Sequence, residues 1–348
     1  MAASVWRDRA VFLTGGNGFV GSWTARALVD AGARVVALVR DRVPNGGLRL
    51  QGLLDRVSCV HGDLLDAPLL QRAVAEYEVT VCLHLGAQAM VGVAHRCPTG
   101  TFGANVMGTA NLLEACRLAG VRHVVLASSD KVYGAADRLP YREDTPLLGS
   151  APYEASKVCA ELAATSYART YGLSIAAARC ANVYGGGDLN FSRLVPETMR
   201  AVLAGRGPVL RTDGSPRRDY LYAEDAARAY LSLGAHCLTR MRPGEMEVFN
   251  FGWGRGVSVL ELVERIIRIS GATTLVPEAG GAGAGHEIQD QWLDSTRARE
   301  VLRWCPEIDL DRGLALTLDW YRGHLGHGRP TAADDEEVGT AWTSLSRD

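Results

Sequence analysis

A tyrosine and a lysine four residues apart, Tyr153 and Lys157, form the strongest chemical pattern in this 348-residue sequence. The segment is typical of a helix, where residues at i and i+4 share one face. A phenol with a pKa of about 10 is a poor base at neutral pH, and an adjacent ammonium stabilises its phenolate. Tyr153 could therefore take a hydroxyl proton as the carbon gives up a hydride, while Ser129, after a predicted strand, hydrogen-bonds the same oxygen.

The two residues after Ser129 add a second acid–base pair, Asp130 and Lys131. A lysine must lose about 3 pK units to act as a base near neutrality, at a cost of about 4 kcal/mol, which burial and the charge of Lys157 could supply. Neighbouring Asp and Lys prefer the carboxylate and ammonium forms, so the pair must titrate as a coupled unit. The conflict shrinks if the two side chains point to different sides of a substrate. The alternative is a plain ion pair that caps the strand end.

A glycine-rich segment near the N-terminus has the spacing G-x-x-G-x-x-G. Between a strand and a helix, such a turn lets the backbone approach a pyrophosphate at the helix N-terminus, although turns before helices also use glycine for conformational reasons alone. The residues of this segment that we expect to bind a dinucleotide are Gly15, Asn17, Gly18, Phe19, Val20 and Gly21.

The end of the second predicted strand bears on the choice between NAD and NADP. An acidic residue there would bind the ribose 2′-hydroxyl, and the sequence has Arg40, Asp41 and Arg42. Arg40 and Arg42 could accept a 2′-phosphate, which favours NADP, whereas Asp41 could serve NAD in a shifted register. Both cofactors stay open at this point.

Short β-branched runs alternate with longer helical patterns, which predicts βαβ crossovers and a doubly wound, Rossmann-like α/β fold. We expect a dinucleotide-binding domain over residues 1–183, mainly a smaller substrate lobe over 184–325, and a flexible tail over 326–348. The strands expected in the first domain are 10–14, 34–39, 57–60, 80–85, 122–128 and 173–179. The helices expected in the second part are 191–204, 223–233, 258–269 and 312–324, with a Gly/Ala-rich loop at 279–285.

The bulk composition excludes several classes of function. The net charge of -2 provides no field for binding nucleic acid. Eight cysteines without a C-x-x-C pair, and an N-terminus without a signal-peptide pattern, favour a reducing, cytoplasmic location. No apolar run reaches membrane-spanning length, and the histidines His61, His84 and His123 are more typical of core or edge positions than of a metal site. Glu161 is expected to be solvated or structural.

Taken in order, the glycine turn, Ser129 and the Tyr153–Lys157 pair make residues 10–321 resemble the extended short-chain dehydrogenase/reductase family of sugar epimerases and dehydratases. The resemblance implies a nucleotide-diphosphate sugar as substrate, a tightly bound NAD or NADP, and a homodimer joined through helices near 102–119 and 153–171. It also implies further cofactor residues, which are Asp63, Leu64, Leu85, Ala87 and Asn105, and substrate residues, which are Asn182, Arg193 and Arg218.

The Asp130–Lys131 pair resembles that of the CDP-glucose 4,6-dehydratases, as do residues 18–23 and 185–188, whereas the segment after Arg218 follows the general family pattern. The resemblance implies oxidation at C4, loss of water across C5 and C6, and return of the hydride to C6. Lys131 would remove the C5 proton and Asp130 would protonate the departing 6-hydroxyl. The alternatives are a C4 epimerase or 4-keto reductase, a uronic acid nucleotide decarboxylase, and a non-catalytic dinucleotide sensor.

Overall fold

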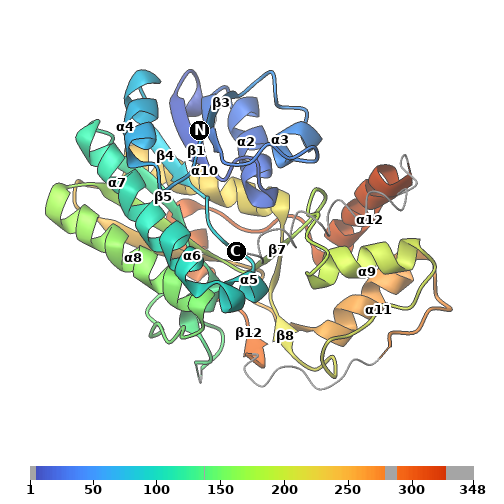
Figure 1. Cartoon of the computed structure of the whole chain (residues 1–348). Coiled ribbons are helices and arrows are strands. Elements are labelled where there is room, and N and C mark those ends of the chain that lie inside the picture. The colour runs from blue at the N-terminus through green and yellow to red at the C-terminus, as the bar shows by residue number, and fades with distance from the viewer. Residues whose placement is uncertain (1–4, 137, 279–287, 327–348) are drawn as a thin grey trace.

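The computed structural model describes residues 5–136, 138–278 and 288–326, and its centre is a seven-stranded parallel sheet (Figure 1). The spatial order of the strands is β10-β6-β5-β4-β1-β2-β3, as expected for a doubly wound sheet. The predicted Rossmann-like α/β fold is therefore confirmed. The strands are β1 (Ala10–Thr14), β2 (Arg34–Val39), β3 (Ser58–His61), β4 (Val81–His84), β5 (His123–Ala127), β6 (Ser174–Cys180) and β10 (Met246–Phe251).

Helices cover both faces of this sheet, which explains why its strands are nearly continuous apolar runs. On one face the buried core joins the sheet to α2 (Phe19–Asp30) and α10 (Ala223–Thr239). On the other face it joins the sheet to α4 (Ala67–Glu76), α7 (Gly108–Leu118) and α8 (Pro152–Tyr171). Short helices connect these layers: α3 (Gly47–Leu50), α5 (Val91–Arg96) and α6 (Pro98–Phe102).

The long helix expected over 102–119 is interrupted by a π-helical turn, Gly103–Met107, between α6 and α7. π-Helical turns are rare in proteins, and those that do occur often lie at functional sites. This one contains the buried Asn105.

A smaller lobe with its own apolar core packs beside the sheet (Figure 1). Its helices are α9 (Leu194–Leu203), α11 (Val259–Ser270) and α12 (Leu310–Gly326), and a π-helical turn, Ala298–Leu302, precedes α12. Two small sheets connect the lobe to the main domain: β7 (Asn182–Tyr184) pairs with β9 (Tyr220–Tyr222), and β8 (Arg217–Arg218) lies between β11 (Val257–Ser258) and β12 (Asp290–Gln291).

Two elements of the range 184–325 pack into the core of the central sheet and not into that of the smaller lobe. Strand β10 pairs with β6 over its full length, and α10 packs against the sheet, so these two elements of the range 184–325 belong to the α/β domain of the central sheet. The expected loop at 279–285 and all but the first residue of the expected tail at 326–348 lie outside the described residues. Over the described ranges, the structure contains no helix long and apolar enough to cross a membrane.

Candidate active site

The residues with the strongest chemical pattern come together where β5 ends. Ser129 caps the short 3₁₀ helix Asp130–Tyr133 by accepting a hydrogen bond from the Lys131 backbone at 3.2 Å. Its hydroxyl lies 3.2 Å from the Asp130 carboxylate, to which it donates. Helix α8 begins at Pro152 and presents Tyr153 to this turn, where its phenol hydrogen-bonds Ser129.

Lys157 lies one turn further along α8 and is almost completely buried, at 6% exposure. Its ammonium donates to the backbone carbonyl of Ala127 at 2.8 Å. Burial lowers the pKa of Lys157 to about 8, although the nearby Glu161 carboxylate opposes the shift. Burial also raises the pKa of the Tyr153 phenol, while the hydrogen bond with Ser129 lowers it. Tyr153 therefore needs the positive charge on its helix to become a base.

Asp130 and Lys131 face each other, and their side chains do not diverge around a substrate. The Lys131 Nζ lies 3.1 Å from each carboxylate oxygen of Asp130, and it also donates to Gln291. Burial lowers the pKa of Lys131, and this effect exceeds the opposing effect of the Asp130 charge. The pair is in direct contact, so its two proton transfers are coupled.

Lysine occurs at only two positions in the sequence. Lysine and arginine together number 37, and Lys131 and Lys157 are the only lysines. Arginine stays protonated at any pH that a protein tolerates, whereas a buried lysine can release its proton. Both lysines of the chain therefore lie at this site, where each could in principle release its proton.

The glycine turn fits a pyrophosphate. Gly15 has a φ of +73°, and a Cβ atom there would lie 2.7 Å from the Gly86 backbone nitrogen. A Cβ at Gly21 would lie 2.0 Å from the Gly15 carbonyl oxygen, so Gly15 requires glycine for its backbone conformation and Gly21 for lack of space. The N-cap residue of α2 is Gly18. No N-cap side chain accepts a hydrogen bond from the first backbone N–H groups of this helix. An open helix N-terminus of this kind suits a diphosphate.

The remaining expected cofactor residues line the same edge of the sheet. Arg40 pairs with Asp41 at 2.7 Å on the exposed surface after β2. Asn105 holds the loop after β4, because its amide bonds the Gln88 backbone at 2.7 and 3.0 Å and Ser156 at 2.9 Å. The other expected cofactor residues are half-buried at this edge: Asn17, Phe19, Val20, Asp63, Leu64, Leu85 and Ala87.

The expected substrate residues belong to the segments that connect the two parts of the molecule. Asn182 opens β7, and Arg193 directly precedes α9 and pairs with Asp188 at 3.0 Å. Arg218 is 8% exposed, and its Nη1 donates to the carbonyls of Arg217 at 2.9 Å and of Gln289 at 3.0 Å. These cations also face the acid–base groups. Burial has the largest effect on both groups: it raises the pKa of Tyr153 and lowers the pKa of Lys131. The charge of Arg193 lowers the pKa of Tyr153, and the charge of Arg218 lowers the pKa of Lys131 further.

Asp219 follows Arg218 and acts as a structural anchor. Its carboxylate accepts backbone hydrogen bonds from Trp253 at 2.9 Å, Gly254 at 3.0 Å and Leu293 at 3.4 Å. Burial raises its pKa to about 7. The histidine expected in the core, His84, is buried between Thr14 and Thr109, and desolvation lowers its pKa to about 3.

Two features of the site had no catalytic role in the expectations from sequence. Glu161, expected to be solvated or structural, is buried and forms a bidentate ion pair with Arg179 at 2.6 and 2.9 Å, directly behind Lys157. Gln291 contacts both Asp130 and Lys131 from a strand 160 residues away in the sequence. The sequence around Gln291 could not reveal its role, because a single glutamine is not part of a recognisable motif.

The chain is similar to known proteins over most of its length. The family model described as the NAD dependent epimerase/dehydratase family matches residues 11–251. A UDP-glucose 4-epimerase of Mycolicibacterium smegmatis is 35% identical over 89% of this chain and 97% of the relative. A CDP-glucose 4,6-dehydratase of Salmonella typhimurium is 29% identical over 92% of each chain. The crystal structure of a dTDP-glucose 4,6-dehydratase from Streptomyces venezuelae with NAD bound has a TM-score of 0.81 and 30% identity, covering 92% of this chain and 99% of that one.

The family model matches more than half of the chain, and the two relatives cover 89% and 92% of it. Dehydratases and epimerases acting on nucleotide sugars are both among them. The chain is a member of the NAD-dependent epimerase/dehydratase family of enzymes.

Proposed function

We propose that the protein is a nucleotide-sugar 4,6-dehydratase. The observation that carries this proposal is the hydrogen-bonded chain from Tyr153 through Ser129 to Asp130, with Lys131 in contact with Asp130. A C4 epimerase or ketoreductase needs only the first two residues and Lys157. Elimination of water needs an additional acid and an additional base, and both are present beside Ser129.

The proton balance of a 4,6-dehydration matches this chain. The reaction removes the proton of the 4-hydroxyl and releases the 6-hydroxyl as water, so one proton must travel from O4 to O6. Tyr153 accepts the O4 proton, and its hydroxyl can pass a proton to Ser129, which donates to the Asp130 carboxylate at 3.2 Å. Asp130 then protonates the departing 6-hydroxyl.

Lys131 acts at C5 in the same cycle. A bound nicotinamide supplies the hydride acceptor for C4 and the hydride donor for C6. The C4 ketone acidifies the C5 proton, Lys131 removes it as the C5=C6 bond forms, and the protonated Lys131 later returns a proton to C5. Elimination leaves Asp130 ionised and Lys131 protonated, which is the ion pair with 3.1 Å contacts. The protons balance over the cycle, because the proton from O4 leaves in the water released from C6 and the proton that Lys131 takes from C5 is replaced when Lys131 protonates C5.

The residues around the reacting centre suggest how the rest of the substrate and the cofactor bind. We assign the diphosphate of the sugar nucleotide to Asn182, Arg193 and Arg218. We assign the NAD pyrophosphate to the turn at the start of α2 and the adenosine to Asp63 and Leu64. The Arg40–Asp41 ion pair supports NAD, because the Arg40 guanidinium that would bind the 2′-phosphate of NADP is already paired with Asp41.

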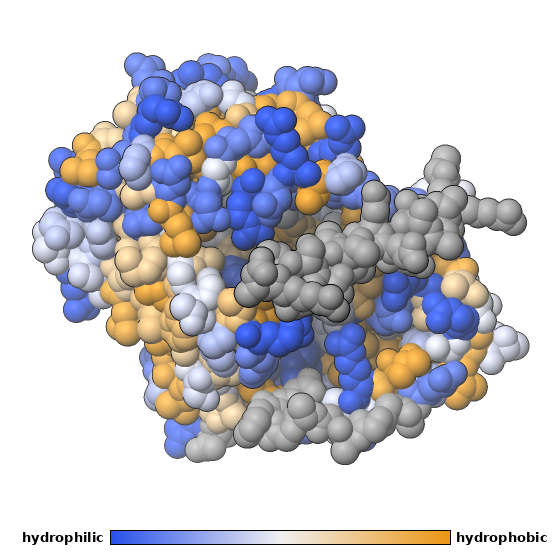
Figure 2. Space-filling view, in the orientation of Figure 1, coloured by the Kyte–Doolittle hydropathy of each residue, from blue (hydrophilic) through white to orange (hydrophobic). Residues whose placement is uncertain are grey.

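The quaternary state and location complete the proposal. Helices α7 and α8 lie side by side on one face of the molecule, where Figure 2 shows a broad apolar area. We infer a homodimer that buries this face. The exposed apolar side chains on these helices, on the turn before α7 and at the end of α6 are Phe102, Met107, Leu118, Leu162 and Tyr171. All eight cysteines are free thiols, which supports a reducing compartment such as the cytoplasm.

A C4 epimerase is the second candidate, and the 35% identity to the Mycolicibacterium smegmatis epimerase favours it. One experiment separates the two. The purified protein is incubated with CDP-glucose, dTDP-glucose and UDP-glucose, and the mass of each product is measured. We expect one of the three to lose a single water. A product of unchanged mass with an inverted C4 centre, and no loss of water from any of them, would contradict the proposal.

A further inference from the structure

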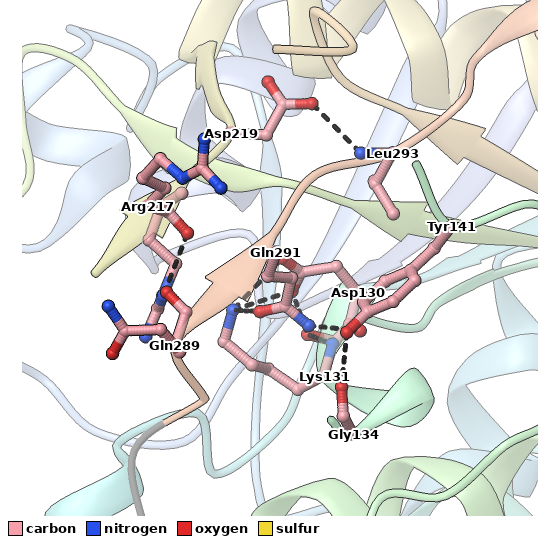
Figure 3. Close-up of polar contacts among 11 residues, drawn as sticks. Asp130, Lys131, Gly134, Tyr141, Arg217, Asp219, Gln289, Gln291 and Leu293 are labelled. Carbon is pink, nitrogen blue, oxygen red and sulfur yellow. Dashed lines mark hydrogen bonds and ion pairs between the residues drawn. The ribbon is translucent and has the colours of Figure 1, made fainter. Parts of the chain in front are cut away.

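Gln291 reaches from the small β8–β12 sheet into the acid–base pair (Figure 3). Its side chain is completely buried. The amide nitrogen donates to the backbone carbonyl of Asp130 at 2.8 Å, and the amide oxygen accepts a hydrogen bond from the Lys131 ammonium. A flipped amide would place an NH₂ group against the ammonium, so the two contacts together fix the orientation of the side chain.

The Lys131 ammonium has three N–H groups and the structure provides three acceptors. Two are the Asp130 carboxylate oxygens, each at 3.1 Å, and the third is the Gln291 amide oxygen. Because the lysine head group is largely removed from solvent, an acceptor that is lost is not fully replaced by water. Gln291 therefore contributes directly to the stability of the protonated form.

The strand that carries Gln291 is also bonded to the arginine proposed to bind phosphate. Strand β12 runs parallel to β8, with Gln291 in register with Arg218. Two backbone bonds hold this register, from Arg217 to the Gln289 carbonyl at 2.9 Å and from Asp219 to the Gln291 carbonyl at 3.0 Å. The Gln289 carbonyl also accepts from the Arg218 guanidinium at 3.0 Å. These contacts connect the phosphate side of the site with the proton-transfer side.

We propose that Gln291 is a positioning residue for proton transfer, which holds the Lys131 ammonium against Asp130 and links this pair to Arg218. The inference rests on the proposed dehydratase reaction, because an epimerase has no use for a proton on Lys131. The charged groups that act on Lys131 are Asp130 beside it, Arg218 on β8 and Glu154 on α8. Gln291 is a neutral group in contact with both Lys131 and the Asp130 backbone, so its substitution by another neutral residue removes hydrogen bonds without removing a charge.

Two substitutions of Gln291 are expected to move the titration of Lys131 in opposite directions. Gln291→Met keeps the length of the side chain and removes the acceptor, so Lys131 should release its proton about one pH unit lower. Gln291→Glu adds a carboxylate beside the ammonium, so Lys131 should release its proton at least about one pH unit higher. A purely structural role for Gln291 would not produce shifts of opposite sign.

The titration can be read directly, because the chain has only two lysines. The protein is labelled with acetic anhydride over a series of pH values, and the extent of acetylation at Lys131 and Lys157 is measured by mass spectrometry. Lys157 is the internal control and should titrate alike in all variants. Gln289→Met is the matched control, because the Gln289 side chain bonds Ser215 at 3.0 Å on the exposed surface and should leave Lys131 unchanged. An unchanged Lys131 midpoint in both Gln291 variants, or equal shifts at Lys157, would overturn the inference.

A second measurement keeps this inference separate from the proposed function. The pH dependence of deuterium incorporation at C5 should shift in the same direction as the Lys131 titration in each variant. If the wild-type protein incorporates no deuterium at C5 with any substrate, the dehydratase proposal fails, and the inferred role in catalysis fails with it even if the labelling shifts occur. If C5 exchange occurs but its pH profile is the same in all variants, the dehydratase proposal stands and the role of Gln291 is refuted.

Discussion

Lys157 combines a positive charge with nearly complete burial, and both properties follow from its position on α8. The helix places it one turn after Tyr153, against the carbonyl of Ala127 at the end of β5. Burial disfavours the charged form, which is why its pKa falls from 10.5 to about 8. The same charge is the group that a Tyr153 phenolate needs, so the site keeps a cation at a cost in stability.

This cost predicts a pH dependence of stability. Below about pH 8 Lys157 is protonated in both the folded and unfolded states, and the folded state carries the desolvation penalty. Between about pH 8 and 10.5 the folded state releases the proton first, so this residue makes the free energy of unfolding rise with pH across that window. Lys157→Met should therefore be more stable than the wild type at pH 7, by about 3 kcal/mol.

Urea denaturation of both proteins over a pH series from neutrality upward measures this difference. The advantage of Lys157→Met should shrink steadily as the pH rises, because the wild-type lysine becomes neutral in the folded state. A difference that stays constant over the whole series would show that the charge of Lys157 is not what destabilises the protein.

At the scale of the elements, helix α8 is tied to strand β6 by a buried ion pair. The Glu161 and Arg179 side chains are 6% and 4% exposed, and Arg179 also donates to Tyr133 at 2.9 Å. Glu161→Ala leaves the guanidinium buried without its carboxylate, so the free energy of unfolding should fall by about 3 to 5 kcal/mol. The double variant Glu161→Leu with Arg179→Met removes both charges and should recover most of this loss. Thermal and urea unfolding of the three proteins test the prediction, and a double variant no more stable than Glu161→Ala would contradict it.

The elements that sequence predicts well are those whose signal is local. Strands 10–14 and 34–39 coincide with β1 and β2, because buried strands of a parallel sheet are continuous β-branched runs. Strand β10 was not predicted, since its partner β6 lies far back in the chain and its own apolar run is short. The sequence left open whether the Asp130 and Lys131 side chains diverge, because side-chain direction in a one-turn 3₁₀ helix depends on what packs against it; in the structure they are in contact.

The same distinction applies to the site. Tyr153 and Lys157 could be paired from sequence because four residues make one helical turn. Gln291 could not, because only the pairing of β12 with β8 brings it to Lys131. Glu161 was recognised only as solvated or structural, since its partner Arg179 lies on the next strand.

At the scale of the whole molecule, the exposed apolar face of α7 and α8 predicts the homodimer. Leu162 is 62% exposed near the middle of α8, and a charge there should oppose burial of this face. Leu162→Asp is expected to shift the protein to a monomer in light scattering coupled to size-exclusion chromatography. Leu316→Asp is the matched control, because Leu316 is exposed on α12 in the other lobe. A wild-type monomer, or a dimer that Leu162→Asp leaves intact, would contradict the prediction.

We propose that Lys131 and Asp130 add an elimination to the C4 oxidation carried out at Tyr153. Lys131→Arg tests it most directly, because arginine keeps the positive charge and the hydrogen-bond donors and cannot act as a base. Wild type and variant are incubated in deuterated water with the nucleotide sugar that the wild type accepts, and the product is examined by mass spectrometry and NMR. We expect the wild-type product to lose one water and to carry deuterium at C5, and the variant to do neither while C4 oxidation persists. A variant that dehydrates and labels its substrate like the wild type would contradict the account.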